Sequence, residues 1–355
     1  MDRTQPHTEP AEVDPRPTPR PGTRTTPQWG RVFADALAHG PGGYAYCVMK
    51  DGELASIGSW GFARMPADTP DHQGIPFDIA TRCNLASVSK TVTATALFAM
   101  VAKDWVASVN EPFWPILAAA LPGVTPASGV ASVTLGELLM MLARLPEDGA
   151  LYTHDGQTVL EFVEAYVQTN AVLPRQRYVY SNTNFTILQT VISTLAAANQ
   201  QRDYVDWVQA AILEPLNIDT TVFSPVPDAE AGGTLTYDSA KPQAAGYWWP
   251  PMQCIGPGGW IASARSLVTY LAGISSPDVL GPDLSGFMMQ ELFGWYHAGT
   301  HDGLAYHHNG GLTHAGSGVS TGVVRFPDGS DAVLLSNKPS PGIIALMVEA
   351  YETRA

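Results

Sequence analysis

The chain is short of cysteine, of charge and of long apolar runs, and each shortage excludes a class of protein. Its 355 residues include three cysteines, Cys47, Cys83 and Cys254, which are too few and too scattered for a disulfide framework or a cysteine-based zinc site. Charged residues make up 15% of the chain and the formal net charge is −14, which argues against nucleic acid or an anionic membrane surface as a partner. No apolar run approaches the ~20 residues of a membrane span.

The N-terminal stretch differs in composition from everything after it. Its first 27 residues include seven prolines and no apolar segment of the kind found in secretory signals. We therefore expect residues 1–28 to form a disordered, Pro-rich tail and the protein to be cytoplasmic.

The rest of the chain divides by pattern into a sheet region and a helical region. The pair Asp51-Gly52 between two strand-like runs predicts a β-hairpin over residues 44–60. Further strands are expected at 304–308, 320–326 and 332–336, and helices at 29–38, 87–101, 134–145, 157–167, 184–198, 204–213, 262–272 and 343–352. We predict an α+β fold in which residues 29–108 and 235–355 form an antiparallel sheet flanked by helices, and residues 109–234 form an all-helical region.

The helix that begins at Ser87 is apolar or small on every side, which predicts that it is buried. Ser87 and Lys90 are three positions apart and so lie on one helix face. A lysine beside a low-dielectric core tends to lose its proton, and a neutral amine beside a hydroxyl is a base beside a nucleophile. The alternative is that Ser87 caps the helix while Lys90 reaches solvent, and the spacing alone does not decide between the two.

Three later segments carry polar groups next to predicted helices or glycines. Tyr180-Ser181-Asn182 offers a phenol and a carboxamide just before a helix. His308-Asn309-Gly310-Gly311 ends a strand in glycines, which allow a backbone to approach a ligand closely. Gly258-Gly259 stands before a predicted helix.

In this order and at this spacing, the four segments together resemble the class C β-lactamase-related serine hydrolases, within the superfamily of penicillin-binding proteins. The resemblance extends from Trp29 to the C-terminus. It implies the β-lactamase/transpeptidase-like fold and an acyl-enzyme mechanism. In that mechanism Ser87 attacks an ester or amide carbonyl, Lys90 and Tyr180 share the removal of its proton, and the backbone N–H groups of Ser87 and Gly311 form the oxyanion hole.

The resemblance also implies a substrate-binding role for Asn182, Gly310 and His308. His308 departs from the pattern of the drug-hydrolysing members, which carry a lysine at this position. A histidine is mostly neutral at pH 7 unless its pKa is raised, so a carboxylate-bearing substrate is less expected than an uncharged ester or amide.

Two alternative interpretations of the sequence place the functional site on other residues. The segment Gly318-Val319-Ser320-Thr321-Gly322 fits the nucleophile elbow of α/β-hydrolases, but that motif requires a helix after the serine, and here a strand is predicted. The histidines at 297, 301, 307, 308 and 314 suggest a metal site, but the stretch from 297 to 301 reads as a loop rather than the helix that such spacing requires. We expect no metal and no cofactor.

The sequence therefore predicts a serine hydrolase, esterase-like, that acts on a small and uncharged ester or amide. Trp248, Trp249 and Trp260 either line an apolar pocket for this substrate or belong to ordinary core packing. An acyltransferase, a D-amino-acid-selective peptidase or amidase, and a β-lactamase share the first half of the mechanism and remain open. A non-catalytic ligand-binding protein is a further alternative, although it would have no need for Ser87, Lys90 and Tyr180 together.

Overall fold

The computed structural model describes residues 27–152, 156–174, 178–225, 234–238, 252–314 and 316–353. Almost all of the predicted N-terminal tail, residues 1–28, therefore lies outside the described residues.

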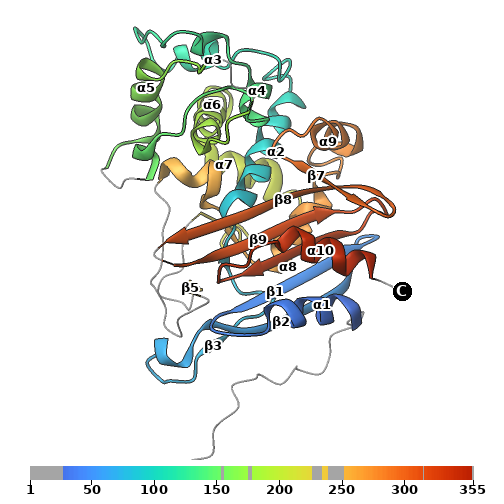
Figure 1. Ribbon diagram of the computed structural model, residues 1–355. Coiled ribbons are helices and arrows are strands. Elements are labelled where there is room, and N and C mark those ends of the chain that lie inside the picture. Colours follow the sequence, from blue (N-terminus) through green and yellow to red (C-terminus); the bar gives the residue numbers. More distant parts are fainter. Residues whose placement is uncertain are drawn as a thin grey trace, which may run out of the picture.

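One antiparallel sheet organises the described part of the molecule (Figure 1). Its strands lie in the order β3-β2-β1-β10-β9-β8-β7, with β5 paired to β9, and a separate two-stranded sheet joins β4 to β6. The strands are β1 (Gly43–Lys50), β2 (Glu53–Arg64), β3 (Ile75–Pro76), β4 (Cys83–Asn84), β5 (Tyr237–Asp238), β6 (Ile261–Ala262), β7 (Tyr296–Thr300), β8 (Gly303–His314), β9 (Ser317–Arg325) and β10 (Asp331–Ser336). The predicted hairpin is confirmed: β1 and β2 pair antiparallel, and Asp51 and Gly52 take φ values of 52° and 79° in the turn.

Ten α-helices surround or extend this sheet in the described residues. They are α1 (Pro27–Leu37), α2 (Ser89–Val101), α3 (Trp114–Ala118), α4 (Leu135–Leu139), α5 (Val159–Thr169), α6 (Asn182–Gln200), α7 (Tyr204–Val208), α8 (Ala264–Gly273), α9 (Gly281–Gln290) and α10 (Ile343–Glu352). The helices α3 to α7 gather at one end of the molecule, and α2 lies between them and the sheet (Figure 1).

The sheet has a hydrophobic layer on each face. Successive side chains of a strand point to opposite faces of the sheet, and in the central strands the side chains on both faces are apolar. On β10, Leu334 packs in the cluster beneath α1 and α10, whereas Val333 and Leu335 pack in the main core with α8. The helices α1 and α10 cover the same face (Figure 1). A central strand buried on both sides reads as a continuous apolar run, which is how the sequence of β10 reads.

The helix α2 is enclosed, as its sequence predicts. Every residue from Ser89 to Met100 is buried. The residues before it, Ala86–Val88, form a single 3₁₀ turn (η2), so Ser87 lies just ahead of the α-helix rather than inside its first turn.

The observed elements differ from the predicted ones in several places. The helix expected over 134–145 ends at Leu139, because Met141 and Arg144 take left-handed φ values of 59° and 58°. The strand β7 and the helix α9 were not predicted. The segment Tyr296–Thr300 shows no strand-like alternation, but it pairs through its backbone with β8, so His297 lies in an edge strand and not in a loop. The sequence of α9 contains two glycines and a proline, which weaken the helical pattern although Pro282 suits the first turn.

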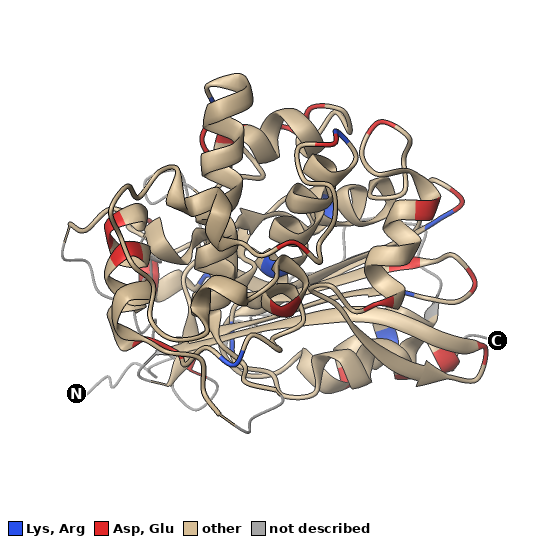
Figure 2. Ribbon diagram, turned by 90° about the horizontal axis from the view of Figure 1, so that it is seen from above, with Lys and Arg blue, Asp and Glu red and all other residues tan. Residues whose placement is uncertain are grey.

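The architecture confirms the predicted α+β class with a β-lactamase/transpeptidase-like arrangement. The three cysteines are free and buried. Acidic positions outnumber basic ones and are scattered over separate helices and loops (Figure 2). Within the described residues, no helix combines the length and the apolar character that a bilayer span requires.

Candidate active site

The turn that carries Ser87 is held on one side by the small β4–β6 sheet and on the other side by the main sheet. On one side β4 pairs with β6, and the Leu85 backbone N–H donates to the Trp260 carbonyl oxygen at 2.8 Å. On the other side the Thr321 hydroxyl of β9 donates to the Leu85 carbonyl oxygen at 2.7 Å. Ala86 takes a left-handed φ of 45°, and its N–H donates to the Asn84 side-chain oxygen at 2.7 Å. A strained residue held in this way fixes the direction of the next side chain, Ser87.

The structure brings together the three residues for which the sequence predicts catalytic roles. The Ser87 Oγ lies 2.8 Å from the Tyr180 hydroxyl and 3.1 Å from the Lys90 Nζ. Ser87 and Lys90 belong to one turn of chain, whereas Tyr180 reaches them from the segment just before α6. The hydroxyl, the amine and the phenol therefore share one small space.

Lys90 is fully buried and makes three hydrogen bonds. Its Nζ donates to the Asn182 Oδ1 at 2.6 Å, to the Pro257 carbonyl oxygen at 2.8 Å and to the Ser87 Oγ at 3.1 Å. In the part of the chain that the structure describes, Lys90 forms no ion pair. Burial penalises the charged form and lowers the pKa of Lys90 from 10.5 to about 7, although the more distant Glu147 acts in the opposite direction.

Tyr180 is a partly exposed residue with its hydroxyl turned inward. Its exposed fraction is 42%, while its hydroxyl contacts the Ser87 Oγ. Desolvation raises the pKa of Tyr180 above 10.0, with the hydrogen bond to Ser87 acting against it. The phenol is therefore protonated near neutral pH.

The glycines of β8 differ in what surrounds them. A Cβ on Gly310 would lie 2.3 Å from the Leu85 carbonyl oxygen and 2.2 Å from the Thr321 hydroxyl, so only glycine lets β8 pass this close to the nucleophile turn. A Cβ on Gly311 would meet nothing within 4 Å. The Cβ side of Gly311 thus faces open space, on a strand that packs against the turn of Ser87.

His308 is buried deeper on the same strand. Its exposed fraction is 2%, and its Nδ1 lies 2.8 Å from the Asn309 carbonyl oxygen. Desolvation, followed by the nearby Lys90, lowers the pKa of His308 from 6.5 to about 3. The imidazole is therefore neutral at pH 7.

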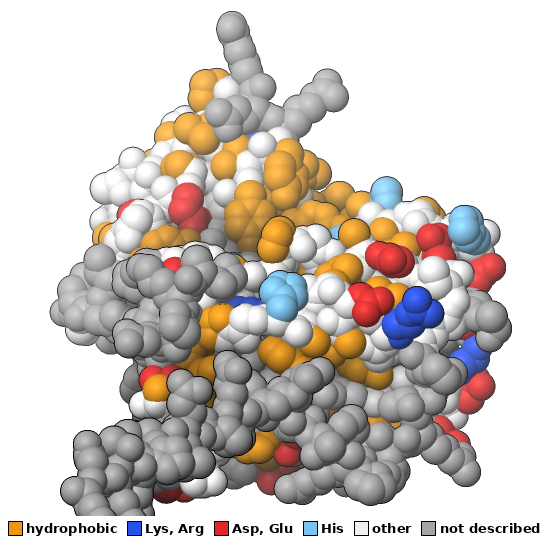
Figure 3. All heavy atoms as spheres, turned by 60° about the horizontal axis from the view of Figure 1, so that its bottom comes forward, with side chains coloured by type: hydrophobic (Ala, Val, Ile, Leu, Met, Phe, Trp, Pro, Cys, Tyr) orange, Lys and Arg blue, Asp and Glu red, His pale blue; other side chains and the backbone are white. Residues whose placement is uncertain are grey.

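A mostly apolar cavity of about 240 Å³ adjoins these groups. Its lining residues come from α2, from the α4 region, from α6 and the segment before it, and from the β7–β8 hairpin and the segment before it: Lys90, Leu139, Met140, Met141, Leu142, Tyr178, Phe185, Leu292, Gly294, Trp295, Tyr296 and His308. A dry cavity of roughly 150 Å³ accommodates benzene, so this one has room for an aromatic ring or a branched chain of similar size. Figure 3 shows a wider gathering of hydrophobic side chains on one face of the molecule.

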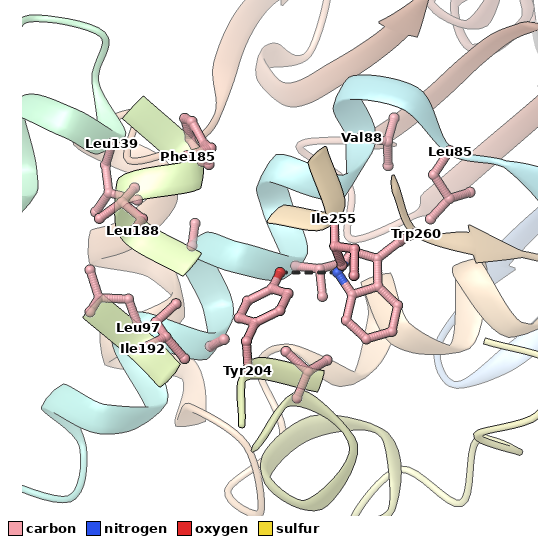
Figure 4. Packing of buried hydrophobic residues seen from close by; sticks show 14 of the residues in the cluster. Leu85, Val88, Leu97, Leu139, Phe185, Leu188, Ile192, Tyr204, Ile255 and Trp260 are labelled. Atoms are coloured by element: carbon pink, nitrogen blue, oxygen red, sulfur yellow. Dashed lines mark hydrogen bonds between the residues drawn. The ribbon is translucent and has the colours of Figure 1, made fainter. Parts of the chain in front are cut away.

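The tryptophans proposed from the sequence as pocket residues do not line this cavity in the described part of the chain. Trp260 is fully buried in the core, where its indole N–H donates to the Tyr204 hydroxyl at 3.0 Å (Figure 4). Its ring also packs against Phe223. Trp260 therefore belongs to ordinary core packing. Trp248 and Trp249 lie outside the described residues.

Sequence reasoning missed Glu147. Its carboxylate lies behind Asn182 and accepts from the Asn182 amide nitrogen at 3.0 Å and from the Thr183 backbone N–H at 3.1 Å. The available signal was an acidic residue in the Pro146-Glu147-Asp148-Gly149 stretch of a charge-poor chain. Nothing in the spacing connects that stretch to Asn182.

The nucleophile-elbow alternative finds no support in the geometry. Ser320 lies inside β9 and accepts a hydrogen bond from the Ser340 backbone N–H at 2.7 Å, and the chain continues as strand, so it is not a nucleophile elbow. Among the described residues, no group of three or more His, Cys, Asp or Glu side chains is arranged to hold a metal ion.

Comparison with known families decides where this chain belongs. The profile of the family described as Beta-lactamase matches residues 29–346. The chain belongs to the beta-lactamase family. The resemblance drawn from Ser87, Lys90, Tyr180 and His308 is therefore confirmed at the level of the family.

Relatives of this beta-lactamase-family chain are distant in sequence. A D-aminopeptidase from Gluconobacter oxydans (strain 621H) is 23% identical over 218 residues, which are 59% of this chain and 38% of the relative, so the match spans about two fifths of that protein. The D-amino acid amidase from Ochrobactrum anthropi SV3, in complex with L-phenylalanine, superposes with a TM-score of 0.72 at 18% identity, over 92% of this chain and 96% of that one. FmtA from Staphylococcus aureus gives a TM-score of 0.72 at 16% identity, over 95% and 94%. At these identities the structural likeness shows the fold alone.

Proposed function

We propose that this chain is a serine hydrolase that cleaves an ester or amide through an acyl-enzyme on Ser87. The observation that carries the proposal is the set of acceptors around Lys90. Two of its three partners, the Asn182 Oδ1 and the Pro257 carbonyl oxygen, are oxygens that can only accept hydrogen bonds. A neutral Lys90 has two N–H groups, which these oxygens engage, and its lone pair then points at the third partner, the Ser87 hydroxyl.

We infer from this arrangement that Lys90 is the base. Lys90 has a pKa of about 7, so much of it is neutral at physiological pH, whereas the raised pKa of Tyr180 keeps the phenol protonated. As Ser87 Oγ bonds to the substrate carbonyl carbon, its proton passes to Lys90. Collapse of the tetrahedral intermediate then breaks the bond between the carbonyl carbon and the leaving group. Tyr180 donates its proton to the leaving group and recovers one from Lys90, and water finally hydrolyses the Ser87 ester and restores the Ser87 hydroxyl.

The substrate is proposed to be uncharged and apolar near the scissile bond. The cavity beside Lys90 is lined mainly by aliphatic and aromatic side chains, and His308, which β8 contributes to the lining, is neutral. A neutral imidazole offers no ion pair to a substrate carboxylate. The apolar part of an ester or amide fills the cavity, while the backbone N–H groups of Ser87 and Gly311 receive the carbonyl oxygen.

A second candidate is a D-amino-acid-selective amidase or peptidase. It is supported by the names of two relatives, a D-aminopeptidase and a D-amino acid amidase, and by a cavity large enough for an aromatic side chain. A β-lactamase and an acyltransferase would use the same first half-reaction.

The test compares substrates on the wild type and on Ser87→Ala. We expect hydrolysis of p-nitrophenyl butyrate by the wild type only, with intact-mass detection of a single fluorophosphonate adduct that Ser87→Ala lacks. The p-nitroanilides of D- and L-phenylalanine, a chromogenic β-lactam and an added alcohol acceptor distinguish the candidates. Equal turnover by both proteins, or labelling at another residue, would remove Ser87 from the mechanism.

A further inference from the structure

The carboxylate of Glu147 collects an unusual number of donors beside the site. Its Oε1 accepts from the Asn182 amide nitrogen at 3.0 Å and from the Tyr152 hydroxyl. Its Oε2 accepts from the Ser181 hydroxyl at 3.0 Å, from the Thr183 backbone N–H at 3.1 Å and from the Thr183 hydroxyl at 3.4 Å. No cation pairs with it in the described part of the chain.

These contacts occupy the carboxylate even though the residue is exposed. A carboxylate offers about four lone-pair positions, and five donors already converge on this one. An incoming ligand cation would have to displace the Tyr152 hydroxyl or the Asn182 amide. The geometry therefore favours a role through Asn182 over direct contact with a substrate.

Glu147 dictates which way the Asn182 carboxamide faces. A carboxylate can only accept, so it selects the Asn182 NH₂ group and would repel the carbonyl oxygen of a flipped amide. With the NH₂ group held at Glu147 and at the Tyr152 hydroxyl, 2.8 Å away, the Asn182 Oδ1 must face Lys90. A flipped Asn182 would instead present N–H groups to Lys90. The charged form of Lys90 has no lone pair and cannot accept a hydrogen bond from them.

We propose that Glu147 is a positioning residue: it fixes the Asn182 carboxamide so that Asn182 engages one N–H of Lys90 and leaves the lysine lone pair aimed at Ser87. This inference rests on the proposed acyl-enzyme function for its catalytic meaning. The structural part, the hold of Glu147 on Lys90 through Asn182, does not depend on it.

Glu147 also acts on the charge of Lys90. The polar and titratable groups that face the lysine are Tyr180 before α6, His308 on β8, Cys254 before the Gly-Gly segment, and Glu147 behind Asn182. Burial raises the pKa of Cys254 to about 12, and Glu147 is the carboxylate among these groups. Its negative charge raises the pKa of Lys90, so its removal makes the lysine titrate at lower pH.

The test substitutes Glu147→Gln, which keeps the shape of the side chain and removes its charge. The chain has only five lysines, so ¹³C-lysine NMR resolves the Lys90 Cε signal, assigned by its loss in Lys90→Met. In Glu147→Gln we expect the Lys90 titration midpoint to move to lower pH. The plateau rate of fluorophosphonate labelling of Ser87 should fall about 10-fold, as when partners that orient a metal ligand are removed.

A matched control is Glu161→Gln. Glu161 is an exposed carboxylate that accepts from the Thr158 backbone N–H at the start of α5, so it resembles Glu147 in its place at a helix N-terminus but lies outside the site. This variant should leave the Lys90 midpoint and the labelling rate unchanged. Glu147→Asp keeps the charge at α6 but draws the oxygens away from Asn182, and it should slow labelling even if Glu147→Gln fails to fold.

Three outcomes would overturn the inference. They are an unmoved Lys90 midpoint in a folded Glu147→Gln protein, an unchanged labelling rate in Glu147→Asp, and a defect confined to the KM of substrates with a free ammonium such as D-phenylalanine p-nitroanilide. The last would make Glu147 a substrate ligand. If the wild type is never labelled at Ser87 while the Lys90 midpoint still shifts, the proposed function fails and the positioning of Lys90 by Glu147 stands.

Discussion

Replacing Lys90 with methionine should remove a strong pH dependence from the stability of the fold. Lys90 has a pKa of about 7 in the folded protein and 10.5 when solvated, and each pKa unit corresponds to about 1.4 kcal/mol. The folded state binds fewer protons than the unfolded state between these values. Stability is therefore greatest above pH 10.5 and is lost as the pH falls to about 7, by roughly 5 kcal/mol in total.

The assay is urea unfolding of the wild type and Lys90→Met at pH 7.5 and pH 9.5. Both pH values lie between the folded and the solvated pKa of Lys90. On going from the lower to the higher pH, the unfolding free energy of the wild type should therefore rise by about 2 to 3 kcal/mol more than that of the variant. The absolute stability of Lys90→Met is a poorer measure, because the oxygens of Asn182 and Pro257 lose their donor. The double difference cancels every other titrating group that the two proteins share.

The control is Lys103→Met, which deletes an exposed lysine and shows how much of the slope any lysine loss produces. A double difference below about 0.5 kcal/mol for Lys90→Met would refute the reasoning. It would mean that the buried amine keeps its proton well above pH 7, and Lys90 could not then be the base.

Three further predictions test neighbouring groups. Tyr180→Phe should lower kcat/KM for p-nitrophenyl butyrate by about 10² to 10⁴, while its circular dichroism spectrum stays native; full turnover would exclude the phenol from proton transfer. Gly310→Ala should cost about 1 to 3 kcal/mol in unfolding free energy, because its Cβ meets the Leu85 carbonyl oxygen, whereas Gly311→Ala should fold with near wild-type stability; equal costs would contradict the assigned packing. His308→Gln should lose less unfolding free energy than the wild type when the pH falls from 6.5 to 4.5. The reason is that the buried imidazole has a pKa of about 3, so in this range the unfolded wild type binds a proton that the folded wild type does not. Parallel plots of unfolding free energy against pH would show that His308 accepts a proton in the folded state.

Sequence patterns predicted well those elements in which the local sequence favours the conformation and the burial that the structure shows. Asp51-Gly52 allows the turn that joins β1 to β2, and the continuous apolar run of β10 matches burial on both faces. The failures occur where tertiary contacts override local pattern. β7 exists because β8 offers it a backbone edge, and the early end of α4 depends on left-handed residues such as Met141 that no local rule requires.

The residues that match the family pattern could be predicted from the sequence, but the contacts that other residues make with them could not. Ser87, Lys90, Tyr180 and Asn182 could be named because their spacing matches a family pattern, and they meet as that pattern requires. Glu147 could not, because its contact with Asn182 depends on how the loop after α4 folds over the start of α6. The pKa of Lys90 could be anticipated in direction only, since its value depends on burial that only the packed structure provides.

The buried helix α2 explains why a lysine can stay uncharged at this point in the fold. Its threonines satisfy their own hydroxyl groups within the protein: Thr93 bonds to the Tyr204 hydroxyl at 2.7 Å and donates to the Gly256 carbonyl oxygen at 2.8 Å, and Thr95 bonds to the Tyr270 hydroxyl at 2.9 Å. Buried polar groups that are already paired do not need water to solvate them. The helix can therefore carry polar side chains on more than one side and still be enclosed, and that enclosure is what lowers the pKa of Lys90. The base of the proposed reaction thus follows from packing around α2 as much as from the residues that Lys90 contacts.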